Sequence, residues 1–283
     1  MLKLKNVRQC FMPDSLQEAV DILRDSQGKA AIVGGGLDIT VFPRPYIEKL
    51  IFLDKLHLNY IKEKNSEIRV GATVTITDME RSLLIKNYLR GRVKEILGEV
   101  ASQLLRNQIT IGGSIARGHP YSDIIPLVYA LRGRIVLSDG KDDEELLIDD
   151  FYKENFRELL KNKIVTEIRL KEYDDSYRFG IKRFVRNATD IPLLNVALLI
   201  KVEKSIIKDA SISLGSRPGI AYRFIKGEEF LKSKKITKEL AKDFQEFTEE
   251  NVDVEGDARL SKTYRKHLAG VYSKNILLNL MEV

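Results

Sequence analysis

Two glycine-rich segments hold the residues of this chain that could do chemistry. The first is the run Gly34–Gly35–Gly36, followed by Asp38, and the second is the pair Gly112–Gly113, followed by Ser114 and, further on, Asp123. Adjacent glycines permit positive φ and a close approach of backbone to ligand, so that amide N–H groups can point at an anion. The second segment is accordingly predicted to be a tight turn. Two phosphate-sized loops in one chain indicate a ligand with two phosphates, such as a dinucleotide.

The elements that must position these loops alternate between strand and helix. An apolar run at residues 30–33 predicts a buried strand that leads into the first loop, and residues 93–104 predict a helix that leads into the second. Asp14 or Ser15 is expected to cap a helix that precedes the first strand. Further strands are predicted at residues 50–53, 60–64, 68–72, 134–137 and 165–170, and a short helix at 124–131.

The pattern changes after a charged stretch at residues 171–176, where we place a domain boundary near residue 172. Three long strands are predicted at residues 177–185, 193–202 and 206–214. Helices are predicted near residues 221–231, 237–249 and 259–280. Strands followed by helices indicate a separate α+β unit.

Composition excludes several classes of protein. The 283 residues carry a net charge of +6, and because lysines alternate with acidic residues, a mixed solvated surface is favoured over a nucleic-acid-binding one. Cys10 is the only cysteine, which rules out internal disulfides and a self-ligated iron–sulfur cluster and favours a cytoplasmic location. His57, His119 and His267 are scattered, so no metal site is expected. The longest apolar run, residues 191–200, is too short for a membrane span.

A Rossmann dinucleotide site is the main alternative for the first loop. A strand, the run Gly34–Gly36 and a second strand that ends at Asp54 imitate that arrangement. However, Ile39 stands where the third glycine is required, and Pro43 and Pro45 interrupt the segment that should form the crossover helix. The Rossmann interpretation also leaves the second glycine segment without a role.

In the order of these segments the chain resembles the FAD-binding (medium) subunit of the molybdenum hydroxylase family, whose members include xanthine dehydrogenase and aerobic carbon monoxide dehydrogenase. Residues 33–38 match that family's first flavin loop and residues 105–114 its second, and the match extends over nearly the whole chain. The resemblance implies an α+β protein. Residues 1–172 would form an FAD-binding domain of the vanillyl-alcohol-oxidase (PCMH) type, with subdomains at about 1–56 and 57–172. Residues 173–283 would form an α+β domain with a three-stranded antiparallel sheet plus helices.

The same resemblance implies non-covalently bound FAD whose pyrophosphate is held by the backbones of both loops. It assigns to the cofactor the residues Ile32, Val33, Gly34, Gly35, Gly36, Leu37, Asp38, Thr110, Ile111, Gly112, Gly113, Ser114, Asp123, Val165 and Lys182. For Asp123, capping of the helix that follows stays open beside contact with ribitol or ribose hydroxyls. For Lys182, a solvated strand position stays open beside a place near the flavin ring. Tyr264 and Arg265 are expected to brace the terminal helix.

The chain departs from the family pattern inside both loops. Leu37 stands where the family often has a small hydroxyl residue, and Ser114 stands where asparagine is common. Arg117 lies in a run that is usually small or amide-bearing, and it adds positive charge near the expected phosphates.

The implied function is that of an oxidoreductase subunit without a catalytic acid, base or nucleophile of its own, because the flavin carries the chemistry. Electrons would come from a [2Fe–2S] small subunit, which receives them from a large subunit with the molybdenum cofactor, and would leave the FAD for NAD or another acceptor. A free-standing flavin-dependent oxidoreductase and a non-catalytic scaffold that has lost FAD stay open as alternatives.

Overall fold

The protein divides into two compact units, each built from segments that are separated in the sequence. The structure, a computed structural model, describes residues 4–153 and 155–281. The first unit comprises the chain up to Leu84, Ser102–Arg117 and Gly133–Leu170; the second comprises Ile85–Ala101, Gly118–Arg132 and the chain from Lys171 on. The chain therefore passes between the units several times.

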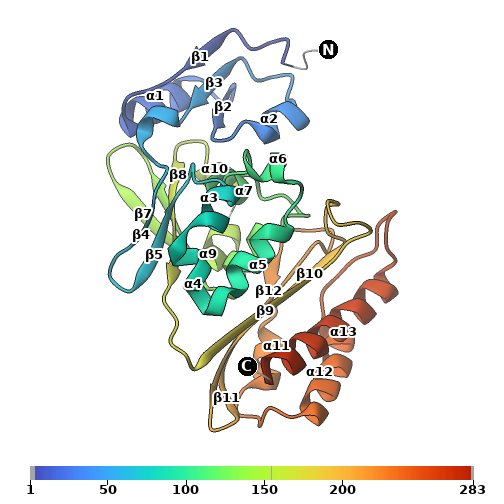
Figure 1. Cartoon of the computed structure of the whole chain (residues 1–283). Coiled ribbons are helices and arrows are strands. Elements are labelled where there is room, and N and C mark those ends of the chain that lie inside the picture. Colours follow the sequence, from blue (N-terminus) through green and yellow to red (C-terminus); the bar gives the residue numbers. More distant parts are fainter. Residues whose placement is uncertain (1–3, 154, 282–283) are drawn as a thin grey trace. The chain divides into compact units, whose positions relative to one another are not determined.

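A small parallel sheet opens the first unit. Its strands β1 (Gln9–Phe11), β2 (Ala30–Val33) and β3 (Lys49–Phe52) lie in the order β1-β3-β2 (Figure 1). Helix α1 (Leu16–Asp25) buries Ala19, Val20 and Leu23, and the Ser15 hydroxyl accepts the Glu18 N–H as the predicted cap. The short helix α2 (Leu37–Val41) and the 3-10 turn η1 (Asp54–Leu56) follow β2 and β3. The predicted strand at residues 30–33 is thus confirmed.

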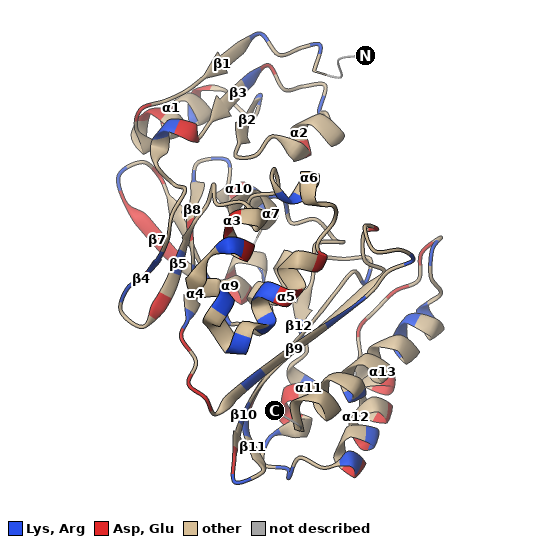
Figure 2. Ribbon diagram, in the orientation of Figure 1, with Lys and Arg blue, Asp and Glu red and all other residues tan. Residues whose placement is uncertain are grey.

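A five-stranded sheet completes the first unit. It has the order β4-β5-β8-β6-β7, with β4 (Ile61–Glu63), β5 (Glu67–Gly71), β6 (Arg134–Ser138), β7 (Asp143–Leu147) and β8 (Ile164–Lys171). The helices of this part are α3 (Ile76–Arg81), α6 (Gln103–Arg106), α7 (Ile111–Arg117), α9 (Ile148–Lys153) and α10 (Phe156–Leu159). On β5 and β8 the charged residues neutralise one another: Arg69 lies 3.2 Å from Glu67 and 3.8 Å from Glu167, which also receives the Tyr60 hydroxyl. Figure 2 shows the same mixing of both charge signs along these strands.

The second unit is organised around three long antiparallel strands, as predicted. Strands β9 (Tyr177–Phe184), β10 (Leu194–Glu203) and β11 (Ile206–Gly215) are joined at one edge by the two-residue strand β12 (Tyr222–Arg223). Their helices are η2 (Tyr88–Gly91), α5 (Arg92–Glu99), α8 (Ile124–Ala130), α11 (Ile225–Leu231), α12 (Lys238–Asn251) and α13 (Lys262–Met281), and α4 (Leu83–Asn87) crosses into this unit. Apolar side chains of β10 and β11 form one core with Ile276, Leu277 and Leu280 of α13.

One predicted helix, over residues 93–104, is wrong in its extent. Helix α5 ends at Glu99, Ala101 has a positive φ of 46°, and the Ser102 hydroxyl accepts the Leu105 N–H to start α6. The break has a physical reason, because the chain leaves the second compact unit for the first between Ala101 and Ser102. A helical pattern in the sequence does not indicate where the chain leaves one compact unit for the other. The helix predicted from residue 221 likewise begins only at Ile225, since Tyr222 and Arg223 pair with β11.

Candidate functional site

The first glycine segment connects β2 to α2 and offers a row of unused hydrogen-bond donors. Gly36 has a positive φ of 77°, a conformation that glycine adopts without strain. No hydrogen bond within residues 4–153 and 155–281 uses the backbone N–H groups of residues 34–38. All five of these residues are partly exposed. Consecutive backbone donors without partners suit a phosphate group.

The second glycine segment is not the tight turn that the sequence predicts, because Gly112 and Gly113 lie in the first turn of α7. Their lack of a side chain serves packing instead. A Cβ atom on Gly112 would lie 2.5 Å from the Cβ of Ala72, and the Gly112 N–H donates to the Ala72 carbonyl at 3.0 Å. Glycine therefore lets the start of α7 pack directly against the end of β5.

The two glycine segments lie against each other within the first unit. A Cβ atom on Gly35 would lie 1.7 Å from the carbonyl oxygen of Gln108, and one on Gly34 would lie 2.8 Å from Thr110 Oγ1. Both figures are shorter than a van der Waals contact, so the backbone of the first loop rests on the chain that enters α7. The two glycine segments that the sequence singled out thus lie in contact with each other.

Donors of the second segment are mostly used inside the chain. The N–H groups of Ile111 and Ser114 donate to the carbonyls of Val74 and Thr110, each at 3.0 Å. The Gly113 N–H donates to Thr110 Oγ1 at 3.2 Å, so the hydrogen of the Thr110 hydroxyl is not required by that bond. Gly113 itself is exposed. The N–H groups of this segment are therefore not available to a phosphate. The groups that could contact one are the Thr110 hydroxyl and the exposed backbone of Gly113.

Three charged side chains stand beside the loops. Asp38 Oδ1 lies 2.6 Å from Arg117 Nε, and Asp38 Oδ2 accepts a hydrogen bond from Arg44 Nη2 at 3.2 Å. The Cζ atom of Arg117 lies 5.7 Å from the centre of the Phe42 ring. Two guanidinium groups thus share one carboxylate, which leaves an excess of positive charge at the place where the unused N–H donors are.

Ile32 and Val165 lie on the strands that support this site. Ile32 is in β2, next to the start of the first loop, and Val165 is buried in β8, where it pairs with Leu137. The carbonyl of Thr166, the next residue of β8, accepts the Ala72 N–H at 2.9 Å. Val165 is therefore linked through Ala72 to Gly112, although its predicted contact with FAD stays a prediction.

Asp123 and Lys182 belong to the second unit, where Asp123 has a partner that the sequence did not indicate. Its carboxylate receives two hydrogen bonds from Arg183 of β9, Nε to Oδ1 at 3.2 Å and Nη2 to Oδ2 at 3.3 Å. Helix capping is wrong for Asp123, because its side chain makes no cap bond and Ser122 Oγ accepts the N–H groups of Ile124 and Ile125 instead. Lys182 is exposed on β9.

Arg183 is a residue that sequence reasoning missed. It is buried with Asp123, with side chains 4% and 9% exposed, and it also donates to the carbonyls of Glu99 and Asp190. The only signal in the sequence is an arginine beside Lys182 in a strand whose other residues alternate in polarity. Such an arginine is ordinarily solvated, so only the fold reveals its partner.

Replacing Asp123 with asparagine is expected to change how stability depends on pH. Burial raises the pKa of the Asp123 carboxyl to about 6, while the Arg183 guanidinium acts in the opposite direction. Because the folded state then holds the proton more tightly than the unfolded state, the wild type should lose about 2 kcal/mol relative to Asp123→Asn as pH rises from 4 to 7. Urea unfolding across this range measures the difference. If the stability of the wild type relative to Asp123→Asn instead stays constant or increases from pH 4 to 7, the ion pair with Arg183 outweighs burial.

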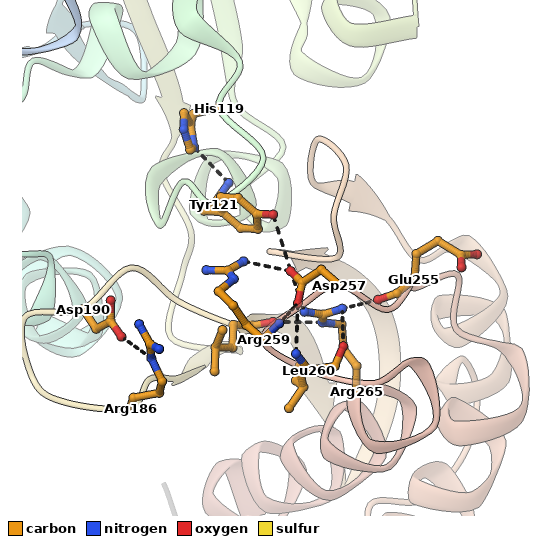
Figure 3. A network of polar contacts seen from close by, with 10 residues as sticks. His119, Tyr121, Arg186, Asp190, Glu255, Asp257, Arg259, Leu260 and Arg265 are labelled. Atoms are coloured by element: carbon orange, nitrogen blue, oxygen red, sulfur yellow. Dashed lines mark hydrogen bonds and ion pairs between the residues drawn. The ribbon is translucent and has the colours of Figure 1, made fainter. Parts of the chain in front are cut away.

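A polar network fixes the N-terminal end of α13 in the same unit (Figure 3). Asp257 Oδ2 lies 3.0 Å from Arg259 Nη2 and 3.2 Å from Arg265 Nη2, and it also faces the Tyr121 hydroxyl at 3.4 Å. The Arg259 guanidinium stacks 4.0 Å from the centre of the Tyr121 ring. Arg265 is fully buried and donates to the Leu193 carbonyl at 3.1 Å. Arg265 therefore braces the start of the terminal helix, as expected, by tying it to Leu193, the residue before β10, and to Asp257.

Within residues 4–153 and 155–281, no helix combines the length and the apolar character that crossing a membrane requires.

Comparison with known proteins covers both parts of the chain. Residues 5–170 match the family model described as FAD binding domain in molybdopterin dehydrogenase, and residues 180–280 match the CO dehydrogenase flavoprotein C-terminal domain. The glyceraldehyde dehydrogenase medium chain of Sulfolobus acidocaldarius is 28% identical over 266 residues, which are 91% of this chain and 92% of that protein. The carbon monoxide dehydrogenase medium chain of Hydrogenophaga pseudoflava is 26% identical over 276 residues, 94% of each chain.

Solved structures share the fold. A chain of the carbon monoxide dehydrogenase from Hydrogenophaga pseudoflava, in a form that lacks the Mo-pyranopterin moiety of the molybdenum cofactor, superimposes with a TM-score of 0.89 at 24% identity and covers 98% of each chain. A chain of quinoline 2-oxidoreductase from Pseudomonas putida 86 gives a TM-score of 0.87 at 22% identity, over 97% of this chain and 96% of that one.

Proposed function

The chain belongs to the family of FAD-binding domains in molybdopterin dehydrogenases, and from that premise we propose that it passes electrons from a [2Fe–2S] partner subunit through FAD to NAD or another acceptor. Its relatives include the medium chains of a glyceraldehyde dehydrogenase and a carbon monoxide dehydrogenase and the FAD-subunit of a nicotinate dehydrogenase, names that imply companion chains. We accordingly propose an iron–sulfur small subunit and a molybdenum-cofactor large subunit as its partners, in the cytoplasm. The sites of substrate oxidation would lie on the large subunit.

The observation that carries the proposal is the row of unpartnered N–H groups at residues 34–38, held against the chain that enters α7. A dinucleotide pyrophosphate bears two negative charges and accepts hydrogen bonds at each phosphate. We propose that residues 34–38 donate their N–H groups to it and that Thr110 adds its hydroxyl. A side chain at Gly34 or Gly35 would collide with Thr110 or Gln108, so glycine is what keeps the two segments together. Unpartnered N–H groups beside the guanidinium groups of Arg44 and Arg117 fit a pyrophosphate.

The remaining assignments follow from the same proposal. Ile32 and Val33 of β2, Leu37 of the loop and Val165 of β8 would contribute apolar contacts, and Ile111–Ser114 the close approach that glycine permits. For Asp123 and Lys182 we keep the assignments that the resemblance implies, the ribitol or ribose hydroxyls for Asp123 and the neighbourhood of the flavin ring for Lys182. When bound, FAD supplies an isoalloxazine ring that can exchange one or two electrons. The family-model ranges, 5–170 and 180–280, support a flavin domain at residues 1–172 and a C-terminal domain at 173–283.

The visible absorption spectrum of the purified chain, with and without added FAD, tests the proposal. We expect the two absorption bands of flavin in the visible region, at one flavin per chain, and we expect heat or acid to release the flavin because it is held without a covalent bond. After chemical reduction under anaerobic conditions, addition of NAD⁺ or of an artificial acceptor should restore the oxidised spectrum and so identify acceptors that work.

Two outcomes would contradict the proposal in different ways. A colourless chain that takes up no FAD would support the scaffold alternative. A flavoprotein that turns over a small substrate without any other chain would support the free-standing oxidoreductase. Co-purification of iron and molybdenum with this chain, from a host that also expresses the small and large subunits, would support the proposal.

A further inference from the structure

The Arg117 side chain has hydrogen-bond donors that its ion pair with Asp38 does not use. Its Nε lies 2.6 Å from Asp38 Oδ1, yet the N–H bond is not directed at that oxygen and Nε has no hydrogen bond of good geometry. No hydrogen bond within the described part of the chain uses its terminal Nη groups either. The side chain is 35% exposed, and the Phe42 ring supports the guanidinium from one side at 5.7 Å. Arg117 is thus held in place with most of its donors unused.

The charge balance of this cluster is incomplete. Arg117 and Arg44 contribute two positive charges and Asp38 one negative charge, which leaves a net charge of +1 beside the free N–H groups of residues 34–38. Asp38 is itself a member of that loop, and Arg117 ends α7, so the ion pair joins the two glycine segments. An anion that enters the loop meets a guanidinium which has donors to spare.

We propose that Arg117 is a pyrophosphate-binding residue of this site and that Asp38 is its competitor: in the absence of ligand Asp38 holds the guanidinium, and a dinucleotide pyrophosphate takes it over. This inference rests on the proposed function, because it requires that the glycine segments bind a dinucleotide. An arginine fork matches two phosphate oxygens at once, and charge-assisted bonds of this kind are stronger than neutral ones. Asp38 keeps its backbone N–H for the phosphate while its carboxylate stays with Arg44.

The competition predicts opposite effects for the two partners of one ion pair. Arg117→Gln removes a ligand-binding charge and should weaken FAD binding about tenfold to a hundredfold. Asp38→Asn removes the competing carboxylate and should strengthen FAD binding by up to about tenfold. If the ion pair only held the two segments together, both substitutions would weaken binding to a similar degree.

Titration of the full-length chain with FAD, followed by quenching of flavin fluorescence, measures these affinities. The set comprises the wild type, Arg117→Gln, Arg117→Lys, Asp38→Asn and, as a control for the loss of one positive charge in the same unit, Arg24→Gln, whose side chain pairs only weakly with Asp21 and Asp139. Titrations at several salt concentrations should show a shallower salt dependence for Arg117→Gln than for the wild type. ADP should compete with FAD in the wild type and lose potency in Arg117→Gln, whereas riboflavin, which has no phosphate, should bind both alike.

The outcomes separate this inference from the function it rests on. Arg117→Lys should recover part of the lost affinity, and thermal unfolding should show every variant folded. Binding of FAD that is equal in the wild type and Arg117→Gln, or weakened alike by Arg117→Gln and Asp38→Asn, would overturn the role of Arg117 while FAD binding stands. A wild type that binds neither FAD nor ADP would overturn both.

Discussion

Replacement of Gly35 by alanine is expected to abolish FAD binding and to destabilise the first compact unit. The new Cβ atom would lie 1.7 Å from the carbonyl oxygen of Gln108 and 2.7 Å from its carbonyl carbon. Both atoms belong to the backbone, so no side chain can rotate away, and the two glycine segments must separate. We expect a loss of at least about 3 kcal/mol in the free energy of unfolding, at the upper end of overpacking effects. Urea unfolding and flavin titration measure the two consequences.

Gly28→Ala is the matched control for this experiment. Gly28 has a positive φ of 83°, and no atom lies within 4 Å of the position that an alanine methyl group would take, so its substitution introduces backbone strain without a collision. It should cost about 1 to 2 kcal/mol and leave FAD binding unchanged. Gly36→Ala introduces the same kind of strain, with a positive φ of 77° and Val33 Cγ1 in ordinary contact at 3.8 Å, so its loss of stability should match that of Gly28→Ala. A Gly35→Ala chain as stable and as avid for FAD as the wild type would show that the two segments do not need this contact.

The glycines also show how far the sequence could predict the site. Their spacing correctly marks the two segments that meet, but the sequence does not say why each glycine is there. Among the glycines of the two segments, only Gly36 has a positive φ, whereas Gly35 and Gly112 are required because another backbone or side chain occupies the place of their Cβ atom. A glycine needed for its conformation and a glycine needed for a close contact look the same in a sequence. For this reason the sequence predicts a turn at Gly112–Gly113, where the structure has the first turn of α7.

The second unit was easier to predict than the site. The near-continuous apolar run of β10 and the amphipathic spacing of α12 are local patterns, and both elements appear where the sequence places them. Asp123 and Arg183 are different, because they lie 60 residues apart and no local pattern couples a buried carboxylate to a buried guanidinium. The break between α5 and α6 is of the same kind, since it reflects the passage of the chain between two units.

Arg265→Met is expected to give the largest loss of stability in the second unit. The wild-type guanidinium is fully buried and donates to the carbonyls of Leu193, Glu255 and Leu260, while Nη2 faces Asp257 at 3.2 Å. Methionine fills much of the space but takes this donor away from the carbonyls of Leu193 and Glu255, whereas the Leu260 carbonyl keeps the Asp257 N–H at 2.9 Å. It also removes one of two positive charges beside Asp257. Breaking a buried ionic network in this way costs about 3 to 5 kcal/mol. Denaturant unfolding measures it, with Lys262→Met as the control, because Lys262 is an exposed residue of the same helix that pairs with Glu255 at the surface.

The loss of stability at acid pH gives a second test of the same network. A packing defect alone would not change how the free energy of unfolding depends on pH. Burial favours the protonated form of Asp257, but hydrogen bonds from Arg259 and the charge of Arg265 prevail and hold the pKa of this carboxyl well below its usual range. A carboxyl with a lowered pKa in the folded state stabilises the protein above its unfolded pKa of about 4, and that contribution is lost as pH falls further. Arg265→Met should therefore lose less stability than the wild type between pH 5 and 3. If both chains lose the same amount over that range, Arg265 acts on the fold through its carbonyl contacts and not through Asp257.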